Sequence, residues 1–335
     1  MRLVVVHGFL LLALLGGCAS PSTGPAVAQA PPIPEPYVRL RETTNLVELQ
    51  IAARRFVPRG LKEGPTIWLA GVSHVGDGDY YHRIQNFLDE QSLVLFEGIS
   101  ERNRGKVGTP PDPAPASGIA SPRSSLQSEM ANSLGLVFQL ESVDYSRAHF
   151  RNSDLSVQEL RDVLASLPSN GEGASRGFET LLSAMEGDSL LGTVVRFGLR
   201  FMGASPKLRA MGRLALLEML GRLKGDIASM PGMTPDLAQL LQVLIEKRDE
   251  RVVLDLRKEL DSARTDDSIT VFYGTGHMPD MEKRLRQELK YRPANEVWFT
   301  AFSVDLGPTG LSPSEQALVR NLVKKTLEEL SKPGE

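Results

Sequence analysis

The sequence predicts an α/β fold, with an α+β arrangement as the alternative, built on a central mixed and partly parallel sheet flanked by helices. Three short apolar runs that end at glycine support this prediction: Thr66–Gly71, Leu93–Gly98 and Ser268–Gly274. Continuous apolar runs of this length are typical of strands that are buried on both faces. The segment from about residue 156 to residue 263 has apolar residues at helical spacing throughout, which predicts a helical insertion or cap in the middle of the chain.

The first residues are expected to lie outside the globular domain. Arg2 precedes the apolar run Leu3–Leu15, which is shorter than the roughly 18 residues that span a bilayer. Residues 1–18 are therefore interpreted as a secretory signal. Their last residues, "LLGGC", resemble the lipobox of bacterial lipoproteins, so Cys18 is the expected lipidation site. An ordinary signal peptide with a chance cysteine is the alternative.

Cys18 is the only cysteine, which excludes an internal disulfide. Residues 19–36 are rich in Pro, Ala and Ser and are predicted to be a disordered tether. Ala19 follows the cysteine where an Asp would indicate inner-membrane retention, so the expected location is the outer membrane of a bacterial envelope, facing the periplasm. The net charge of −3 and the lack of a long basic run argue against a nucleic-acid partner.

The globular domain is expected over residues 37–310, with a C-terminal helix and tail over 311–335. Apolar residues at helical spacing between the first two runs predict a βαβ unit. Residues 134–143 are a weaker candidate strand, and 296–306 are a late one. Residues 102–125 are rich in Pro, Gly and Ser, and a loop of this length is either a functional lid or a disordered insertion.

Two stretches about 200 positions apart repeat one pattern, in which an apolar run is followed by Gly-x-x-His. Gly71 and His74 belong to the first stretch, and Gly274 and His277 to the second. In open α/β sheets ligands bind outside the carboxyl ends of the strands. A glycine there allows a sharp turn or a close approach to the backbone. If the two strands are parallel neighbours, both imidazoles reach the same edge of the sheet.

Glu97 ends an apolar run as well, so it is expected at the same edge. A buried carboxylate without a partner costs on the order of several kcal/mol, so Glu97 needs a metal ion, an arginine or an imidazolium beside it. Two imidazoles and one carboxylate are a normal ligand set for a divalent ion with open positions. His74, His277 and Glu97 are therefore candidate metal ligands, and chance repetition of a short motif is the alternative.

The order of these motifs resembles the TraB/GumN family, which is related to the TIKI metalloproteases and more distantly to erythromycin-esterase-like and haem-uptake ChaN-like proteins. The matching positions are Gly71 with His74, Glu97, Arg248 within "EKRDER", and Gly274 with His277, over roughly residues 45–305. The first motif is Gly-Val-Ser-His where Gly-Thr-x-His is commoner. The long loop after Glu97 replaces what is usually a compact connection.

The resemblance implies a hydrolase that cleaves peptide bonds with a divalent ion such as Mn, Co or Zn, and the lipobox-like string adds a lipid anchor in the cell envelope. The resemblance makes His74 and His277 ligands, Glu97 a ligand or a general base, and Arg248 a partner of Glu97 or an oxyanion stabiliser. Arg251 is the competing arginine. Two alternatives stay open: a metal-free, esterase-like hydrolase with a histidine base, and a non-catalytic protein that sequesters a peptide or small ligand.

Overall fold

The chain divides into two units, Met1–Glu35 and Pro36–Glu335. The structure is a computed structural model that describes residues 36–60, 63–99, 126–165, 203, 205–223, 235–307 and 310–330. The predicted signal with Cys18, nearly all of the tether and the loop over 101–125 lie outside the described residues. No helix in the described ranges combines the length and apolar character that crossing a bilayer requires.

Strands and helices alternate through much of the second unit. The strands are β1 (Val38–Glu42), β2 (Leu46–Pro58), β3 (Thr66–Val72), β4 (Val75–Gly76), β5 (Leu93–Phe96), β6 (Val137–Phe138), β7 (Phe150–Asn152), β8 (Ser268–Gly274) and β9 (Tyr291–Asp305). The helices are α1 (Gly78–Asp89), α2 (Leu126–Leu134), α3 (Gln139–Ser142), α4 (Val157–Ala165), α7 (Pro206–Leu223), α8 (Pro235–Leu260), α9 (Met278–Gln287) and α10 (Pro313–Leu330), with a 3₁₀ turn, η2, at Thr275–His277.

The central sheet is seven-stranded and mixed, as the sequence predicts. Its strand order is β1-β2-β3-β8-β5-β7, and β9 pairs with β2. The strands β3, β8, β5 and β7 are mutually parallel, whereas β1, β3 and β9 run antiparallel to β2. A separate two-stranded antiparallel sheet joins β4 to β6.

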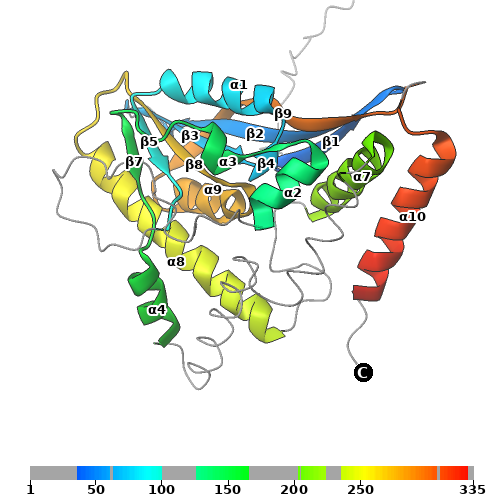
Figure 1. The fold of residues 1–335 in the computed structure, drawn as a ribbon. Helices are drawn as coiled ribbons and strands as arrows, with labels where there is room; N and C mark the ends of the chain where they lie inside the picture. The colour runs from blue at the N-terminus through cyan, green and yellow to red at the C-terminus, as the bar shows by residue number, and fades with distance from the viewer. Residues whose placement is uncertain are drawn as a thin grey trace, which may run out of the picture. The chain divides into compact units, whose positions relative to one another are not determined.

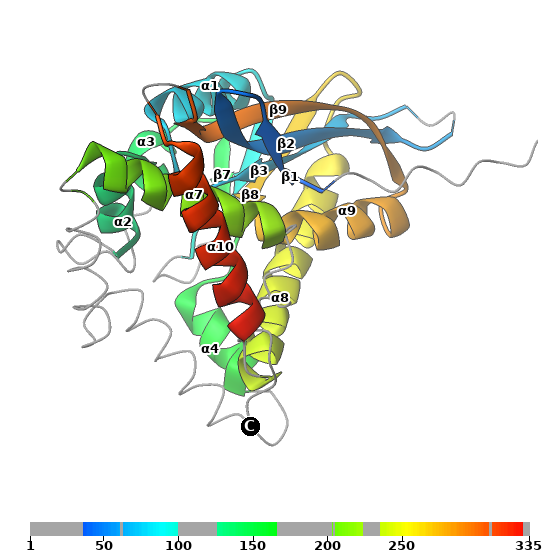
Figure 2. The same cartoon turned by 90° about the vertical axis from the view of Figure 1, so that its right-hand side faces the viewer.

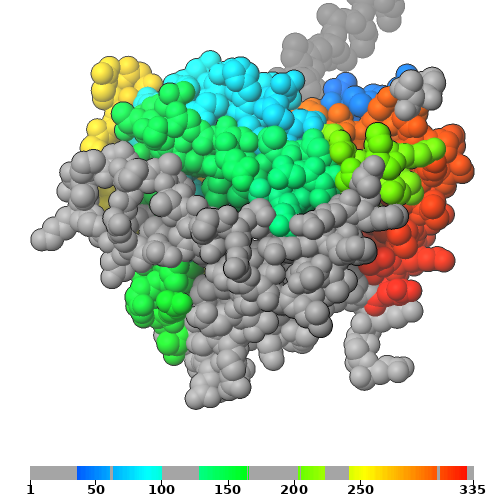
Figure 3. Space-filling view, in the orientation of Figure 1, coloured from blue at the N-terminus to red at the C-terminus, as the bar shows by residue number. Residues whose placement is uncertain are grey.

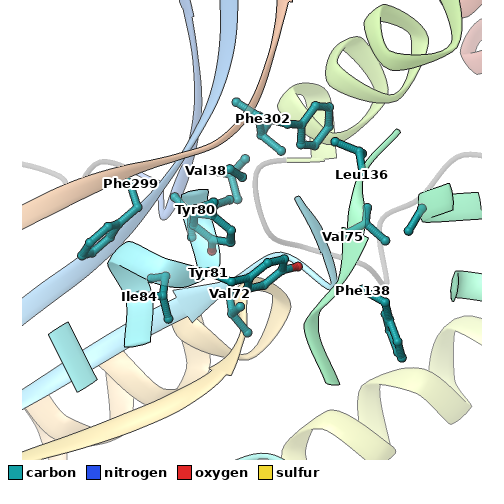
Figure 4. Packing of buried hydrophobic residues seen from close by; sticks show 14 of the residues in the cluster. Val38, Val72, Val75, Tyr80, Tyr81, Ile84, Leu136, Phe138, Phe299 and Phe302 are labelled. Carbon is teal, nitrogen blue, oxygen red and sulfur yellow. The ribbon is translucent and has the colours of Figure 1, made fainter. Parts of the chain in front are cut away.

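Helices cover both faces of the sheet, with α1 on one face and α8 and α9 on the other, as Figure 1 and the turned view in Figure 2 show. Successive residues of β3 belong to different cores: Ile67 and Leu69 pack with α8 and α9, whereas Ala70 and Val72 pack with α1 and α7. Burial on both faces explains why the parallel strands are continuous apolar runs. Figure 4 shows Tyr80 and Tyr81 of α1 in the core that α1 and α7 share with Ala70 and Val72.

Most predicted elements are present, with one error. The three apolar runs form β3, β5 and β8, and the late strand forms the end of β9. The middle region is helical where it is described. The weaker candidate strand over 134–143 is wrong in most of its length, because only Val137 and Phe138 are extended and α3 follows at once. Its partner β4 is only two residues long, so no longer ladder forms there.

Candidate functional site

The carboxyl ends of three neighbouring parallel strands place the predicted site residues at one edge of the sheet. β8 lies between β3 and β5, and Val72 at the end of β3 is opposite Gly274 at the end of β8. His74 follows β3, Glu97 directly follows β5, and His277 ends the 3₁₀ turn after β8. The parallel arrangement on which the prediction depends is therefore present, and the three side chains come from segments far apart in the chain.

Other groups approach the backbone closely at both motif glycines. A methyl group on Gly274 would lie 3.2 Å from Glu97 Oε2 and 3.5 Å from His74 Nε2, so these two atoms face the same small space. A methyl on Gly71 would lie 3.0 Å from the side chain of Thr275. Neither glycine is among those with positive φ. Close approach explains the motif glycines, and a left-handed turn does not.

Glu97 is a largely buried carboxylate whose two oxygens are both hydrogen-bonded. Its side chain is 15% exposed. Gly274 N–H donates to Oε2 at 2.7 Å, and Arg248 Nη2 donates to Oε1 at 2.6 Å. Burial alone would raise the pKa of Glu97, but Arg248, followed by His277 and His74, holds this pKa well below its ordinary value. Glu97 is therefore an anion at neutral pH.

Arg248 is the cation that the buried Glu97 requires. It extends from α8 toward the strand ends, and two of its nitrogens also donate to Asp154, at 2.9 Å from Nε and 2.7 Å from Nη2. Asp154 is fully buried and accepts backbone N–H groups of Gly98 and Leu155 as well. Burial opposes the charge of Arg248, but the two carboxylates raise its pKa well above the ordinary value. This network fixes the guanidinium beside Glu97.

His277 is buried, and Asp249 of α8, the residue after Arg248, orients its imidazole. Its Nδ1 lies 2.6 Å from Oδ1 of Asp249, whose side chain is fully buried. Its Nε2 lies 3.3 Å from Arg248 Nη1 and 3.7 Å from Glu97 Oε1. Burial raises the pKa of Asp249 to about 6, although His277 acts in the opposite direction. His277 therefore directs Nε2 toward the charged centre of the site.

His74 is the exposed member of the site. Its Nδ1 lies 2.9 Å from Oε1 of Gln139, at the start of α3. The amide nitrogen of Gln139 donates to the hydroxyl of Tyr145 at 2.8 Å. His74 Nε2 thus faces the space above Gly274, where solvent or a ligand can reach it.

The structure also separates the two candidate arginines and the remaining histidines. Arg248 joins the site, whereas Arg251 pairs with Glu159 and Asp255 at 3.3 Å. His82 is an exposed residue of α1. His149 Nε2 lies 3.2 Å from the carbonyl oxygen of Leu88, in a packing role. Sequence reasoning missed Gln139, Asp154 and Asp249 as partners of the site.

The fit of a metal ion depends on Arg248. Among the residues that the structure describes, no group of three His, Cys, Asp or Glu side chains is placed to hold a metal ion. As arranged, Arg248 Nη1 faces the nitrogen through which His277 would bind an ion, and Nη2 already pairs with Glu97. The arrangement therefore does not fit one ion bound by His74, His277 and Glu97 together. The donor types are those of a divalent-metal site, so such an ion stays a prediction.

Comparison with known proteins adds no relative to this picture. No protein-family model, no curated protein and no solved structure matches the chain. The site defines a class of centre, a strand-end cluster of two imidazoles, a carboxylate and a guanidinium, and its function is inferred from the side chains themselves.

Proposed function

We propose that this protein is a hydrolase, and that it cleaves peptide or related acyl bonds at the site formed by His74, Glu97, Arg248 and His277. The observation that supports the proposal is the meeting of an exposed imidazole and a buried carboxylate anion above Gly274, with the guanidinium of Arg248 bonded to that carboxylate. A general base, a fixed negative charge and a hydrogen-bond donor are the groups that attack by water on a carbonyl requires.

His74, Glu97 and Arg248 each have a distinct part in this reaction. His74, which is exposed, accepts a proton through Nε2 from the attacking water and returns it to the leaving group as the acyl bond breaks. The negative charge of Glu97, which faces the same space above Gly274, stabilises the imidazolium that forms. Arg248 Nη1, which lies 3.3 Å from His277 Nε2, carries two N–H groups, and the one that is not directed at His277 donates to the developing oxyanion. General-base catalysis of this kind contributes about 10²–10⁴-fold to a rate.

A metal-dependent version of the same hydrolase is the second candidate. Its support is that both histidines have a hydrogen-bond acceptor at Nδ1, as metal-bound histidines usually have. As arranged, Arg248 lies against the atoms that would bind the ion, so this version requires Arg248 to withdraw before His74 and His277, through Nε2, and Glu97, through its carboxylate, could hold it. A bound Mn, Co or Zn ion would polarise the scissile carbonyl and lower the pKa of a bound water. The TraB/GumN and TIKI resemblance points to this version and to peptide substrates.

The proposal includes the place where the hydrolase works. The string before Cys18 supports a lipid anchor in a bacterial envelope, with outer-membrane attachment and a periplasmic domain. The partners are then the membrane, through the N-terminal lipid, and a peptide or small-molecule substrate of the envelope. Nucleic acid is not a proposed partner.

Hydrolysis of a peptide library and a panel of small esters, with and without a chelator, tests the proposal. Cleavage that persists in chelator supports the metal-free version. Cleavage that is lost with chelator and restored by Mn, Co or Zn supports the metal-dependent version. Tight binding of a peptide with no turnover in any of these conditions contradicts the hydrolase and supports the sequestering alternative.

A further inference from the structure

The small two-stranded sheet brings Gln139 against His74. Val75 of β4 is opposite Phe138 of β6, and Figure 4 shows both side chains. One residue beyond this pair, the backbone N–H of Gln139 donates to the carbonyl oxygen of His74 at 2.9 Å. Because the ladder continues into this bond, the separation of the two residues is set by the backbone. Figure 3 shows the residues of α2 and α3, in green, next to α1, in cyan.

The side chain of Gln139 is buried and used at both ends. It is 3% exposed. Oε1 lies 2.9 Å from His74 Nδ1, and Nε2 donates to the hydroxyl of Tyr145 at 2.8 Å. Tyr145 is itself buried, and its ring packs against Phe96 at the end of β5. The amide is thus held between the strand ends and the exposed imidazole.

A neutral imidazole carries one proton, and the hydrogen bond at one nitrogen decides which nitrogen holds it. The carbonyl oxygen of an amide only accepts hydrogen bonds, so at 2.9 Å it requires a proton on His74 Nδ1. The other nitrogen, Nε2, then has a free lone pair over Gly274.

We propose that Gln139 is a positioning residue for His74: it fixes the Nδ1–H tautomer and turns the unprotonated Nε2 toward the space above Gly274. His277 has the same arrangement with the carboxylate of Asp249 as acceptor, whereas Gln139 orients the exposed histidine without adding a charge. A base and a metal ligand both need the lone pair on Nε2, so the inference serves either version of the reaction. Only its consequence for catalysis rests on the proposed function.

The test is the tautomer of His74 read from ¹⁵N NMR of histidine-labelled protein. Spectra are recorded in chelator at about pH 9, above the ordinary imidazole pKa of about 6.5, and His74→Ala assigns the signal. Gln139→Leu removes the acceptor, and Gln139→Glu keeps one. Tyr145→Phe is the matched control, because it removes a contact of the same buried amide but leaves Oε1 in place.

The Nδ1–H form is expected to predominate in the unmodified protein, in Gln139→Glu and in Tyr145→Phe. Gln139→Leu is expected to shift His74 toward the Nε2–H form, which a free imidazole favours. An Nε2–H tautomer in the unmodified protein overturns the proposal. So does a Gln139→Leu variant that keeps Nδ1–H, or an equal shift in Tyr145→Phe, which would indicate general loosening of the packing.

Kinetics supply an independent second readout. With any substrate that the protein turns over, Gln139→Leu is expected to lower kcat about 10–100-fold with little change in KM. The two proposals fail separately. The expected tautomers without turnover of any substrate would leave the role of Gln139 intact and refute the hydrolase. Turnover of a substrate together with an unaltered His74 tautomer in Gln139→Leu would support the hydrolase and refute the role of Gln139.

Discussion

Replacing Arg248 with methionine is the sharpest structural test of the site. Arg248 is 13% exposed and donates to Glu97 and to the fully buried Asp154. Methionine keeps much of the side-chain length and removes the charge. Two carboxylates would then remain buried without their cation, although the backbone N–H groups of Gly98, Leu155 and Gly274 would still donate to them.

Breaking a buried ion pair by removing one partner costs about 3–5 kcal/mol, because the remaining charge is uncompensated. We expect the free energy of unfolding of Arg248→Met to fall by this amount at neutral pH. The sign of the pH dependence follows from Glu97. Its pKa is lowered in the folded protein, so the stability it contributes is present above its unfolded pKa of about 4.3 and is lost as the pH falls. The deficit of the variant should therefore shrink below about pH 4.

Urea unfolding followed by circular dichroism measures this deficit, and Arg251→Met is the matched control. Arg251 lies on the same helix, is 28% exposed and pairs only at 3.3 Å with Glu159 and Asp255. Partly exposed pairs contribute about 0–1 kcal/mol. Equal losses in the two variants, or a loss below about 1 kcal/mol in Arg248→Met, would refute the view that Arg248 neutralises a buried carboxylate cluster.

Three further predictions concern the glycine, the buried acid and the anchor. Gly274→Ala places a methyl 3.2 Å from Glu97 Oε2 and should reduce turnover. Gly78→Ala is the control and should not reduce turnover, because no atom lies within 4 Å of the added carbon. Comparable rates in the two variants would contradict the close-approach explanation. The pKa of Asp249 is raised to about 6, so the protein should lose stability as the pH rises from about 4 to about 6. Thermal melts of Asp249→Asn should lack that decline. An identical decline in the variant would show that groups other than Asp249 cause the decline. Cys18→Ala should release the protein from the membrane fraction or leave it unprocessed, and wild-type fractionation without a diacylglycerol by mass spectrometry would exclude the anchor.

The parallel part of the fold could be predicted because its signal, a run of consecutive apolar residues, lies within each strand. A strand covered by helices on both faces must be apolar at successive positions, as β3, β5 and β8 are. The polar residue after each such strand is then predicted at the carboxyl edge. This reasoning located His74, Glu97 and His277 without knowledge of the strand order.

Elements stabilised by partners far away in the chain were not predictable in the same way. β2 contains the polar residues Glu48, Gln50, Arg54 and Arg55. Arg54 is nevertheless buried, because it pairs with Glu282 of α9 and Glu296 of β9. A charged residue inside a run indicates solvent when its partners are unknown. The long β2 and its pairing with β9 were therefore missed.

The supporting residues of the site were missed for a similar reason. Asp249 lies in a run of charged residues that is typical of a solvent-exposed helical face, and only the packing of α8 shows that it is buried against His277. Gln139 lay inside a stretch interpreted as a strand. Asp154 follows a strand, β7, that is only three residues long, so the strand-end argument that found Glu97 had no clear run from which to start.

The most direct test of the central claim compares hydrolysis by His74→Ala with hydrolysis by His82→Ala. The two histidines are close in sequence and both exposed, but only His74 belongs to the strand-end site. With a substrate found in the peptide and ester panel, the proposal predicts that kcat/KM falls by about 10²–10⁴-fold in His74→Ala and stays at the wild-type value in His82→Ala. Full activity in His74→Ala, with both variants folded, would contradict it.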